Sequence, residues 1–573
     1  MALEIDVKRQ LILDCERSLL VIGGPGSGKT TIALLKAFQY IKAKPLNRGQ
    51  QILFLSFSRN ARARILQSAI GFDDNKEHGR KLNVQTFHAF FLNIIRTHSY
   101  LLGTPKKIVI LPPHDEAALK GNRKDDDPTW VTEKENLFFN EGKITFSRFS
   151  QTTLELISRS SKIRGILSKT FPLIIVDEAQ DTDIEQWQIV EAFKGLSQLI
   201  LLGDLDQQIF DYRPDINPER LNDIRKSLNP LEVTLESQNY RNPHTEILNL
   251  ARDILNNTPK EGIYNGVSLA EYNPMAQNRD TAIKRSVGMI RKVIKESTGE
   301  FPKSIAILTP WTRGVKIVSN ALRSGNIPHR VQFDETATNL SSRLIACLME
   351  PILNNRQHLI WILLILRDFY SAKGSGAELK KYDGWIEIVR NDKIPRGKIV
   401  PYFIFLIEEI QQESFSGNPA KDWIYIQKKL LSCEMKAIRD FTRHSEYLIA
   451  YNRGRIIMRE LTNVWVEHSC YADARSILQK AIIEAQLSSD VINEDGINIM
   501  TTYKSKGKEF DGVIIFHNQY SSPTELPNDN VNLDKSRKLL LVALTRACHH
   551  VYILKEGGCE IQLLHNFSIN PPW

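Results

Sequence analysis

The sequence has few cysteines, no long hydrophobic run and no internal repeat. Its six cysteines lie scattered among 573 residues without a Cys-x-x-Cys pair, which argues against a disulfide framework and against a zinc site. The longest apolar run, residues 359–366, is too short to span a bilayer. The N-terminal residues contain no apolar segment of the kind found in signal peptides. We therefore expect a protein of the reducing cytoplasm with no membrane partner.

The composition is that of an ordinary globular protein with a positive charge. Hydrophobic residues make up 42% of the chain and charged residues 25%. A chain of 573 residues is too long for one hydrophobic core, so several domains are expected. The net charge of +9 is compatible with a polyanionic partner such as nucleic acid. Because many proteins of this size carry a similar charge, composition alone does not decide the function.

A glycine-rich segment, residues 23–30 (Gly-Gly-Pro-Gly-Ser-Gly-Lys-Thr), is the strongest signal in the sequence. The apolar residues 19–22 predict a buried strand before it, and residues 31–38 have helical spacing after it. Glycines let backbone N–H groups converge on a phosphate, and a helix N-terminus adds partial positive charge. We therefore predict that Lys29 reaches the terminal phosphates of a nucleotide and that the Thr30 hydroxyl holds Mg²⁺. The less favoured alternative is a glycine-rich turn before a surface helix.

A second apolar run, residues 171–176, is followed directly by two acids. A strand that ends at such a pair is the expected partner of a phosphate loop. Asp177 is predicted to hold Mg²⁺, and Glu178 to activate the attacking water as a general base. Acids also favour the first turn of a helix, which is the alternative reading of this pair.

A third apolar run, residues 198–202, leads into the polar segment 203–213. Gln207 in this segment is predicted to touch the γ-phosphate of the nucleotide. The aromatic–arginine pair Tyr212 and Arg213 could stack on a base and bind a phosphate. One short loop would then contact both the nucleotide and a nucleic acid.

Three further segments carry weaker signals. Gln10 could read the edge of adenine, because a carboxamide both donates and accepts hydrogen bonds, or it could be a solvated helix residue. Residues 56–61 and 84–90 place small hydroxyls, an aromatic and a base where predicted strands end, the edge at which open α/β sheets bind ligands. Ordinary helix capping is the alternative for both.

Taken in order, these segments resemble the motifs of superfamily 1 helicases of the UvrD/Rep/PcrA kind. The matching segments are Gln10 and residues 23–30, 56–61, 86–88, 177–182, 203–213, 235–241, 304–328, 501–510 and 539–547. The resemblance therefore extends over nearly the whole chain. No single motif after the glycine-rich segment is decisive, but coincidence does not explain their order.

The resemblance implies roles for residues in the second half of the chain. Tyr240 would stack on the adenine ring of ATP, and Arg241 and Arg546 would reach the γ-phosphate. Glu509 would bind the ribose, with Gly507 close to the phosphates. An arginine supplied to a phosphoryl-transfer site accelerates turnover by about 10³–10⁵-fold.

The predicted site residues fall into four groups. The catalytic residues are Lys29, Asp177, Glu178, Gln207, Arg241 and Arg546. The ATP-binding residues are Gln10, Gly23, Gly26, Ser27, Gly28, Lys29, Thr30, Thr31, Tyr240, Gly507 and Glu509. The Mg²⁺ ligands are Thr30 and Asp177. The DNA-binding residues are Phe57, Arg59, Thr86, His88, Tyr212, Arg213, Tyr503 and Lys504.

Four positions depart from the family pattern. Tyr503 stands where the family usually has histidine, and Leu541 where tyrosine is common. Residues 214–215 are Pro-Asp where the family usually has Gly-Ala. These departures concern contacts with the DNA strand rather than ATP hydrolysis.

The predicted fold class is α/β, with two RecA-like P-loop NTPase cores built on parallel sheets. Each core is expected to carry a mainly helical insertion. The first core takes residues 1–105 and 166–228, with its insertion at 106–165. The second core takes residues 229–353 and 490–573, with its insertion at 354–489.

The predicted function is an ATP-dependent 3′–5′ translocase and helicase that acts on single-stranded DNA and tailed duplexes, in DNA repair or phage defence. The alternative is a DNA-activated ATPase switch subunit that serves a nuclease partner and unwinds little by itself. In size and outline, the trimmed insertions are similar to those of the helicase subunit of the Gabija antiphage system. A P-loop kinase or GTPase is disfavoured because the sequence has no convincing guanine-reading Asn-Lys-x-Asp loop.

Overall fold

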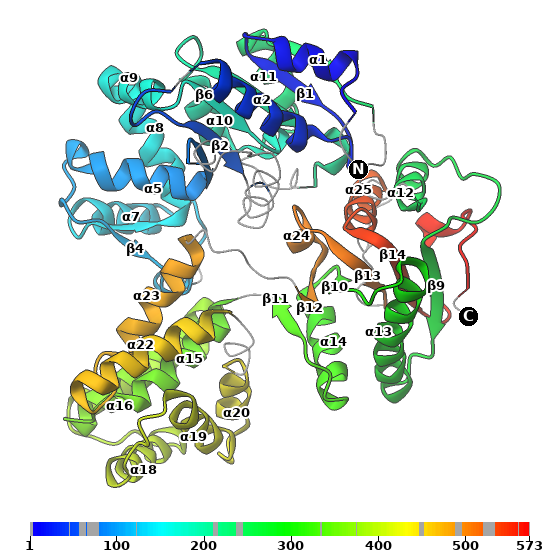
Figure 1. Ribbon diagram of the computed structural model, residues 1–573. Helices are drawn as coiled ribbons and strands as arrows, with labels where there is room; N and C mark the ends of the chain where they lie inside the picture. The colour runs from blue at the N-terminus through cyan, green and yellow to red at the C-terminus, as the bar shows by residue number, and fades with distance from the viewer. Residues whose placement is uncertain are drawn as a thin grey trace. The chain divides into compact units, whose positions relative to one another are not determined.

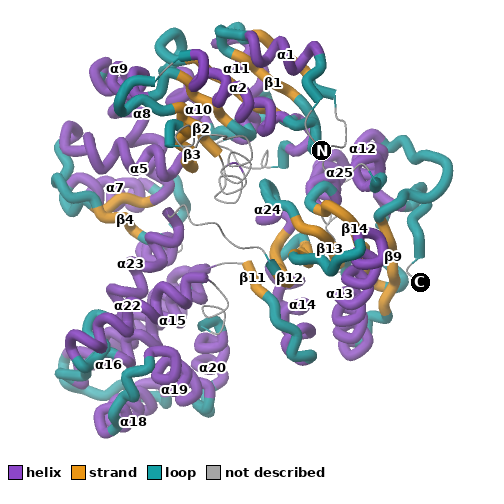
Figure 2. The backbone as a smooth tube through the Cα atoms, viewed as in Figure 1, coloured by secondary structure: helices purple, strands orange, loops and turns teal. Residues whose placement is uncertain are grey.

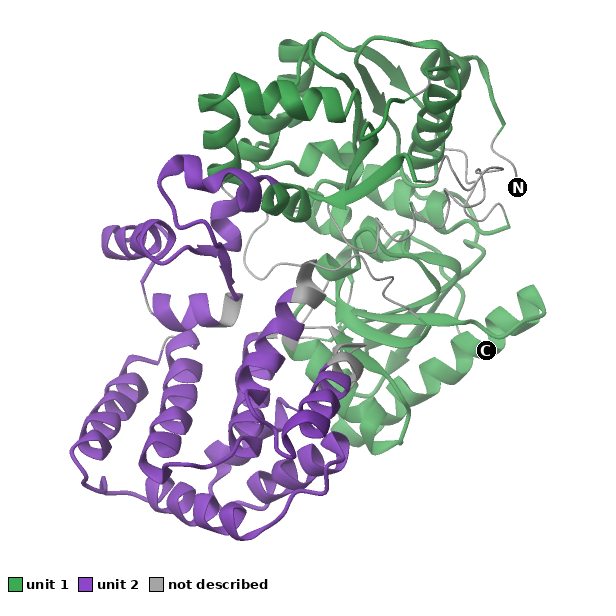
Figure 3. Cartoon of the chain, turned by 60° about the vertical axis from the view of Figure 1, so that its left-hand side comes forward, with its two compact units in different colours: residues 1–93, 150–333, 489–573 green, residues 94–149, 334–488 purple. Residues whose placement is uncertain are grey.

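The chain folds into two compact units, each built from separate stretches of sequence. Unit 1 comprises residues 1–93, 150–333 and 489–573, and unit 2 comprises residues 94–149 and 334–488 (Figure 3). The computed structural model describes residues 4–571 except 45, 57–64, 66–79, 122, 210–215, 237–243, 333–334, 374, 446–451, 488–494, 519–532 and 560.

Unit 1 contains two parallel sheets. Among the described residues, the first sheet has six strands in the order β3-β2-β6-β7-β1-β8. They are β1 (Leu19–Ile22), β2 (Ile52–Ser56), β3 (Leu82–Thr86), β6 (Leu173–Val176), β7 (Gln198–Gly203) and β8 (Leu231–Thr234). The apolar runs seen in the sequence form β1, β6 and β7. Their side chains are almost wholly buried, as in a parallel sheet covered on both faces.

Helices alternate with these strands along the chain. They are α1 (Val7–Asp14), α2 (Lys29–Ala43), α5 (Phe87–His98), α8 (Phe149–Arg159), α9 (Ser161–Thr170), α10 (Ile184–Glu191) and α11 (Arg220–Leu228), with the short 3₁₀ turns η3 (Ala179–Asp181) and η4 (Leu205–Gln207). The Asp183 side chain caps α10 by accepting a hydrogen bond from the backbone N–H of Gln186. The Gln186 side chain in turn accepts a hydrogen bond from the backbone N–H of Asp183. Because every strand is parallel, the polar residues that follow β1, β6 and β7 meet at one edge of the sheet.

The second sheet of unit 1 is also parallel, with the strand order β11-β12-β10-β13-β14-β9. Its strands are β9 (Val267–Tyr272), β10 (Ser304–Thr309), β11 (Arg330–Gln332), β12 (Gly496–Thr501), β13 (Phe510–Phe516) and β14 (Ala547–Glu556). Its helices are α12 (Ile247–Asn256), α13 (Ala276–Thr298), α14 (Thr312–Ser324), α24 (Thr502–Ser505) and α25 (Leu533–Leu544), followed by η5 (Gln562–Leu564). Helix α25 packs beside α12 and is apolar and buried along residues 539–544 (Figure 1).

Unit 2 is mainly helical (Figure 2). Its first stretch contains η1 (Ser99–Leu102), α6 (Pro113–Lys120), α7 (Pro128–Phe139), η2 (Phe146–Arg148) and the small parallel pair β4 (Val109–Leu111) and β5 (Lys143–Thr145). Its second stretch contains α15 (Glu335–Met349), α16 (Asn355–Ala372), α17 (Gly376–Arg390), α18 (Ile399–Gln412), α19 (Pro419–Leu431), α20 (Lys436–Arg443), α22 (Asn452–His468) and α23 (Ala474–Leu487). The apolar run 359–366 lies within α16 and faces the core of unit 2. None of the described helices combines the length and apolar character that a bilayer crossing needs.

The two stretches of unit 2 are joined by polar contacts. Arg343 on α15 pairs with Asp115 on α6 at 2.6 Å, and Gln479 on α23 donates to the same carboxylate at 3.1 Å. The Ser371 hydroxyl donates to the Ala118 carbonyl at 2.7 Å. Segments more than two hundred residues apart in sequence therefore share one folded body.

The predicted fold class is confirmed: two parallel α/β sheets are accompanied by mainly helical insertions. The compact units begin and end at other residues than the insertions predicted at 106–165 and 354–489. Helix α15, expected in the second core, packs in unit 2 against α16, α19 and α23, while α9 belongs to unit 1. An amphipathic helix has the same apolar spacing on either side of such a boundary, so its sequence does not show which unit covers its apolar face.

Candidate active site

The glycine-rich segment forms a tight loop between β1 and α2. Gly26 and Gly28 have φ values of +73° and +83°, a left-handed conformation that glycine adopts without a steric penalty. A Cβ atom on Gly23 would lie 2.6 Å from the Ser27 hydroxyl oxygen, so this position has no room for a side chain. The loop ends at Gly28, the N-cap of α2, and the helix starts at Lys29.

Lys29 lies inside this loop. Its ammonium group donates hydrogen bonds to the carbonyl oxygens of Gly23 and, at 3.1 Å, of Gly24. It also pairs with the carboxylate of Asp204 at 3.3 Å, and the Asp204 side chain is only 2% exposed. The three N–H groups of the ammonium thus have acceptors from the loop and from the end of β7.

The loop opens into a cavity of about 290 Å³ in unit 1. The lining residues come from both sheets: Gly24, Pro25, Gly26, Ser27, Gly28, Lys29, Thr30, Thr31, Leu34, Ile65, Asp177, Glu178, Gln207, Gly507, Glu509 and Arg546. Most of the residues predicted from the sequence to bind ATP or to catalyse its hydrolysis therefore lie around one cavity.

Two of the acids follow β6 directly. Glu178 has φ +53°, which turns the chain sharply after the strand, and its carboxylate accepts a hydrogen bond from the Gln180 amide at 2.6 Å. Burial raises the pKa of Glu178, but the charges of Lys506 and Lys29 outweigh burial and hold it below its usual value. Glu178 is therefore a carboxylate that can accept a proton at neutral pH.

A buried ion pair joins the loops of the two sheets. Lys506, which follows α24, pairs with the carboxylate of Asp181 and also donates to the backbone carbonyl of Gln207. Burial raises the pKa of Asp181 to about 6. Burial also lowers the pKa of Lys506, but the nearby carboxylates of Asp181 and Glu178 outweigh this effect and keep it above its usual value.

Gln207 links an acid of the first sheet to a cation of the second. Its amide nitrogen donates to the Asp204 carboxylate at 2.7 Å, and its amide oxygen accepts from the Arg546 guanidinium at 2.7 Å. A carboxylate only accepts and a guanidinium only donates, so these partners determine the orientation of the amide. Arg546 also donates to the carbonyls of Val542 and Lys508 and is 3% exposed.

These residues fit a nucleoside triphosphate with a divalent cation. The Ser27 hydroxyl is buried without a hydrogen-bond partner among the described residues, as expected of a group that awaits a phosphate oxygen. Thr30 and Asp177 both line the cavity. No group of three or more His, Cys, Asp or Glu residues gathers anywhere in the described part of the chain.

Some predicted residues lie away from the cavity. Gln10 is on α1, is exposed, and donates to both carboxylate oxygens of Asp14 at 2.9 and 3.0 Å. The Thr86 hydroxyl caps α5 through the Ala89 amide, and His88 is exposed in the first turn of that helix. Six predicted residues lie outside the described residues: Phe57, Arg59, Tyr212, Arg213, Tyr240 and Arg241.

Four residues of the site were not among those predicted. Asp181, Asp204 and Lys506 stand inside segments quoted for the family resemblance, so a closer reading of those segments could have found them. Arg9 donates to the Ser27 carbonyl at 3.1 Å and is 2% exposed, so α1 holds the glycine-rich loop from outside. Nothing in the sequence distinguishes Arg9 from a solvated helix residue.

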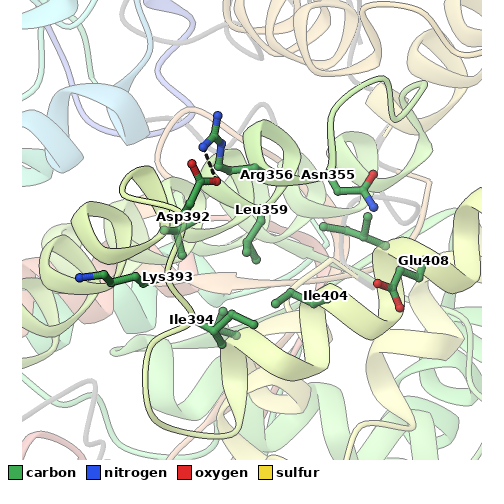
Figure 4. Close-up of a pocket in the computed structure, with 11 residues that line it drawn as sticks. Asn355, Arg356, Leu359, Asp392, Lys393, Ile394, Ile404 and Glu408 are labelled. Carbon is green, nitrogen blue, oxygen red and sulfur yellow. Dashed lines mark ion pairs between the residues drawn. The ribbon is translucent and has the colours of Figure 1, made fainter.

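Unit 2 contains a cavity of a different kind, with a volume of about 220 Å³ (Figure 4). Its floor is apolar, with Leu359 and Ile404 among its residues, and its rim carries an ion pair between Arg356 and Asp392. No glycine-rich loop borders it. Those described residues that the sequence predicted to be catalytic line the cavity in unit 1 instead.

Comparisons with known proteins cover nearly the whole chain. The family model described as "AAA domain" matches residues 12–213, and the one described as "UvrD-like helicase C-terminal domain" matches residues 233–556. The chain is 23% identical to a probable DNA helicase II homolog of Mycoplasma pneumoniae, over 96% of this chain and 84% of that protein. It is 22% identical to the ATP-dependent DNA helicase Rep of Escherichia coli, over 92% and 87% of the two chains. With the ATP-dependent DNA helicase PcrA of Staphylococcus aureus the identity is 20%, over 94% and 81%.

Proposed function

Because the chain belongs to the UvrD-like family of superfamily 1A helicases, we propose that it couples ATP hydrolysis to 3′–5′ movement along single-stranded DNA and to separation of duplex strands. The observation that carries this proposal is the continuous chain of contacts from Lys29 through Asp204 and Gln207 to Arg546. It joins the phosphate loop of one sheet to an arginine of the other. A change at the phosphates can therefore alter how the two sheets are held together.

The residues around the cavity have distinct roles in hydrolysis. When bound, ATP and Mg²⁺ supply the phosphoryl group and the cation that neutralises its charge. Glu178 accepts the proton of the attacking water, while Lys29 and Arg546 stabilise the negative charge that develops. Gln207 orients the reacting groups, and Thr30 and Asp177 hold the cation. Arg241 would add a second positive charge.

The nucleotide is held along the rest of the cavity. The loop amides from Gly26 to Thr31 bind the phosphates. Gly507 lies close to the phosphates, and Glu509 binds the ribose. Gln10 and Tyr240 would recognise the adenine. Gln10 would have to release Asp14 to do so.

Single-stranded DNA would cross the edges at which the strands of both sheets end. Thr86 and His88 lie at the end of β3, and Tyr503 and Lys504 follow β12. Phe57, Arg59, Tyr212 and Arg213 complete the proposed DNA-binding set. Stacking and phosphate contacts of this kind tolerate any base sequence.

A second candidate function keeps the ATPase and drops autonomous unwinding. In it, the chain is a DNA-activated switch that serves a nuclease partner in phage defence. Tyr503 favours this candidate, because it replaces the usual histidine and its ring is half-buried against the apolar core of the second sheet. Strand separation on tailed duplexes, measured with and without a partner nuclease, distinguishes the two. A role in DNA repair is compatible with the first candidate.

Steady-state ATP hydrolysis, with and without single-stranded DNA, RNA or duplex, tests the proposal. We expect strong stimulation by single-stranded DNA and loss of turnover in Lys29→Ala, with DNA binding largely retained. Lys42→Ala is a matched control, because Lys42 is exposed on the same helix. Unchanged turnover in Lys29→Ala would contradict the proposal.

A further inference from the structure

Two aromatic residues stand at the same edge of the second sheet, one on each of two neighbouring strands. Strands β10 and β12 are parallel neighbours in which Thr309 is paired with Thr501. Trp311 and Tyr503 each follow two residues later. Because paired residues of adjacent parallel strands lie at the same height, both aromatics stand just beyond the carboxyl ends of the strands.

The two aromatic side chains differ in exposure. Tyr503 packs partly on the apolar core of the second sheet. Trp311 is 42% exposed, so much of its ring system remains open to solvent. Trp311 therefore offers the larger free stacking surface at this edge.

The backbone around Trp311 is firmly held. Its carbonyl oxygen accepts hydrogen bonds from the Thr309 hydroxyl and from the Gly314 amide, both at 3.0 Å. A Cβ atom on Gly314 would lie 2.9 Å from the Cβ of Thr309, so the turn closes tightly on itself. The backbone that carries the indole is therefore held in place, which lowers the entropy cost of binding a ligand.

The charged residues in the two segments that follow β10 and β12 are basic up to Glu509. Residues 309–316 and 501–508 contain five bases, namely Arg313, Lys316, Lys504, Lys506 and Lys508. Arg313, Lys316 and Lys504 are exposed, and Lys506 and Lys508 are buried. An exposed aromatic among cations suits a strand of stacked bases and anionic phosphates.

We propose that Trp311 is a base-stacking residue for single-stranded DNA and that Arg313, Lys316 and Lys504 bind the adjoining phosphates. This inference rests on the proposed function and adds a stacking residue to the DNA-binding set named from the sequence. The loop after β10 has no glycine-rich phosphate site like the loop after β1 and instead carries an aromatic side chain.

The test is the affinity for a fluorescent oligo-dT of twenty nucleotides, measured by anisotropy without nucleotide. Trp311→Ala should weaken binding by about 5- to 150-fold, the range given by loss of one stacked base. Trp311→Phe keeps a smaller ring and should fall between Trp311→Ala and the wild type. Phe301→Ala is the matched control, because Phe301 is 61% exposed at the other end of β10 and should bind as the wild type does.

Two further measurements separate stacking from charge. A strand of abasic sites has phosphates but no bases, so Trp311→Ala and the wild type should bind it equally. Lys316→Ala should lower the slope of log Kd against log salt by about 0.7, whereas Trp311→Ala should leave this slope unchanged. If both Trp311 variants bind oligo-dT like the wild type, or if Trp311→Ala also loses affinity for the abasic strand, the inference is wrong. A wild-type protein that binds no single-stranded DNA would instead contradict the proposed function itself.

Discussion

The two parallel sheets of unit 1 differ most in the loops that follow β1 and β10. The loop after β1 is made of glycines and ends in Lys29, which the loop's own carbonyls surround. The loop after β10 consists of Pro310 and Trp311 and exposes an indole. Two similar strand–loop–helix units therefore present different chemistry, one suited to phosphates and the other to a base.

The sheets differ also in the buried charges that their loops carry beside the cavity. The loops of the first sheet supply the buried carboxylates of Asp177, Asp181 and Asp204. The second sheet supplies the buried cations Lys506 and Arg546. Buried charges are costly unless they are paired, so neither set is well stabilised without the other. The comparison teaches that paired buried charges hold the loops of the two sheets together.

Removing the cation that the second sheet brings to Gln207 should have the largest effect. In Arg546→Ala, turnover of ATP should fall by about 10³- to 10⁵-fold, because no guanidinium then stabilises the transferred phosphoryl group. Arg546→Lys should recover little, since one ammonium cannot replace the forked contacts to Gln207, Lys508 and Val542.

Single-turnover hydrolysis with saturating ATP measures this loss. Arg537→Ala is the matched control, because Arg537 lies on the same helix α25 and pairs with Asp534. If Arg546→Ala hydrolyses ATP within about tenfold of the wild type, the second sheet supplies no essential cation and the comparison of the sheets fails.

Much of this arrangement could be predicted from the sequence. The phosphate loop, Glu178 and Gln207 follow apolar runs that predict strands, Arg546 is implied by the family resemblance, and all of them line one cavity. The partners of these residues could not be predicted in the same way. The pairing of Lys506 with Asp181 joins residues more than three hundred positions apart, and no local spacing encodes it.

In the fold as well, local elements could be predicted from the sequence, whereas contacts between distant segments could not. Strands β1, β6 and β7 were predicted from short apolar runs, because a strand buried on both faces is apolar throughout. The contacts of Asp115 with Arg343 and Gln479 bring the two stretches of unit 2 together, and no pattern in either stretch indicates them.

Asp204 should affect ATP binding and turnover in opposite directions. In the structure the Asp204 carboxylate pairs with the Lys29 ammonium and accepts a hydrogen bond from the Gln207 amide. Lys29 and Gln207 are the two groups that are proposed to contact the terminal phosphate. Asp204→Asn removes the competing charge, and a hydrogen bond to a charged group contributes about 1.5–3 kcal/mol, so nucleotide affinity should rise by about tenfold or more. Turnover should fall, because an amide has only one acceptor oxygen for the two N–H groups, of Gln207 and of Asp206, that the carboxylate now accepts.

Titration with a fluorescent, non-hydrolysable ATP analogue measures the affinity independently of catalysis. Asp206→Asn is the matched control, because Asp206 lies two residues away and its carboxylate is not part of this chain of contacts. Weaker nucleotide binding in Asp204→Asn would show that Asp204 supports the nucleotide rather than competing with it.

The smallest effect should come from the residue that holds the loop after β1. The loop after β10 is closed by its own residues, Thr309 and Gly314, whereas the loop after β1 is also held from outside by Arg9. Arg9→Lys keeps the charge and loses one hydrogen bond, worth about 1 kcal/mol, so KM for ATP should rise by about fivefold with little change in kcat. Lys8→Ala, at an exposed neighbouring position on α1, should leave both constants unchanged. An unchanged KM in Arg9→Lys would mean that the loop after β1, like the loop after β10, keeps its shape without support from a neighbouring helix.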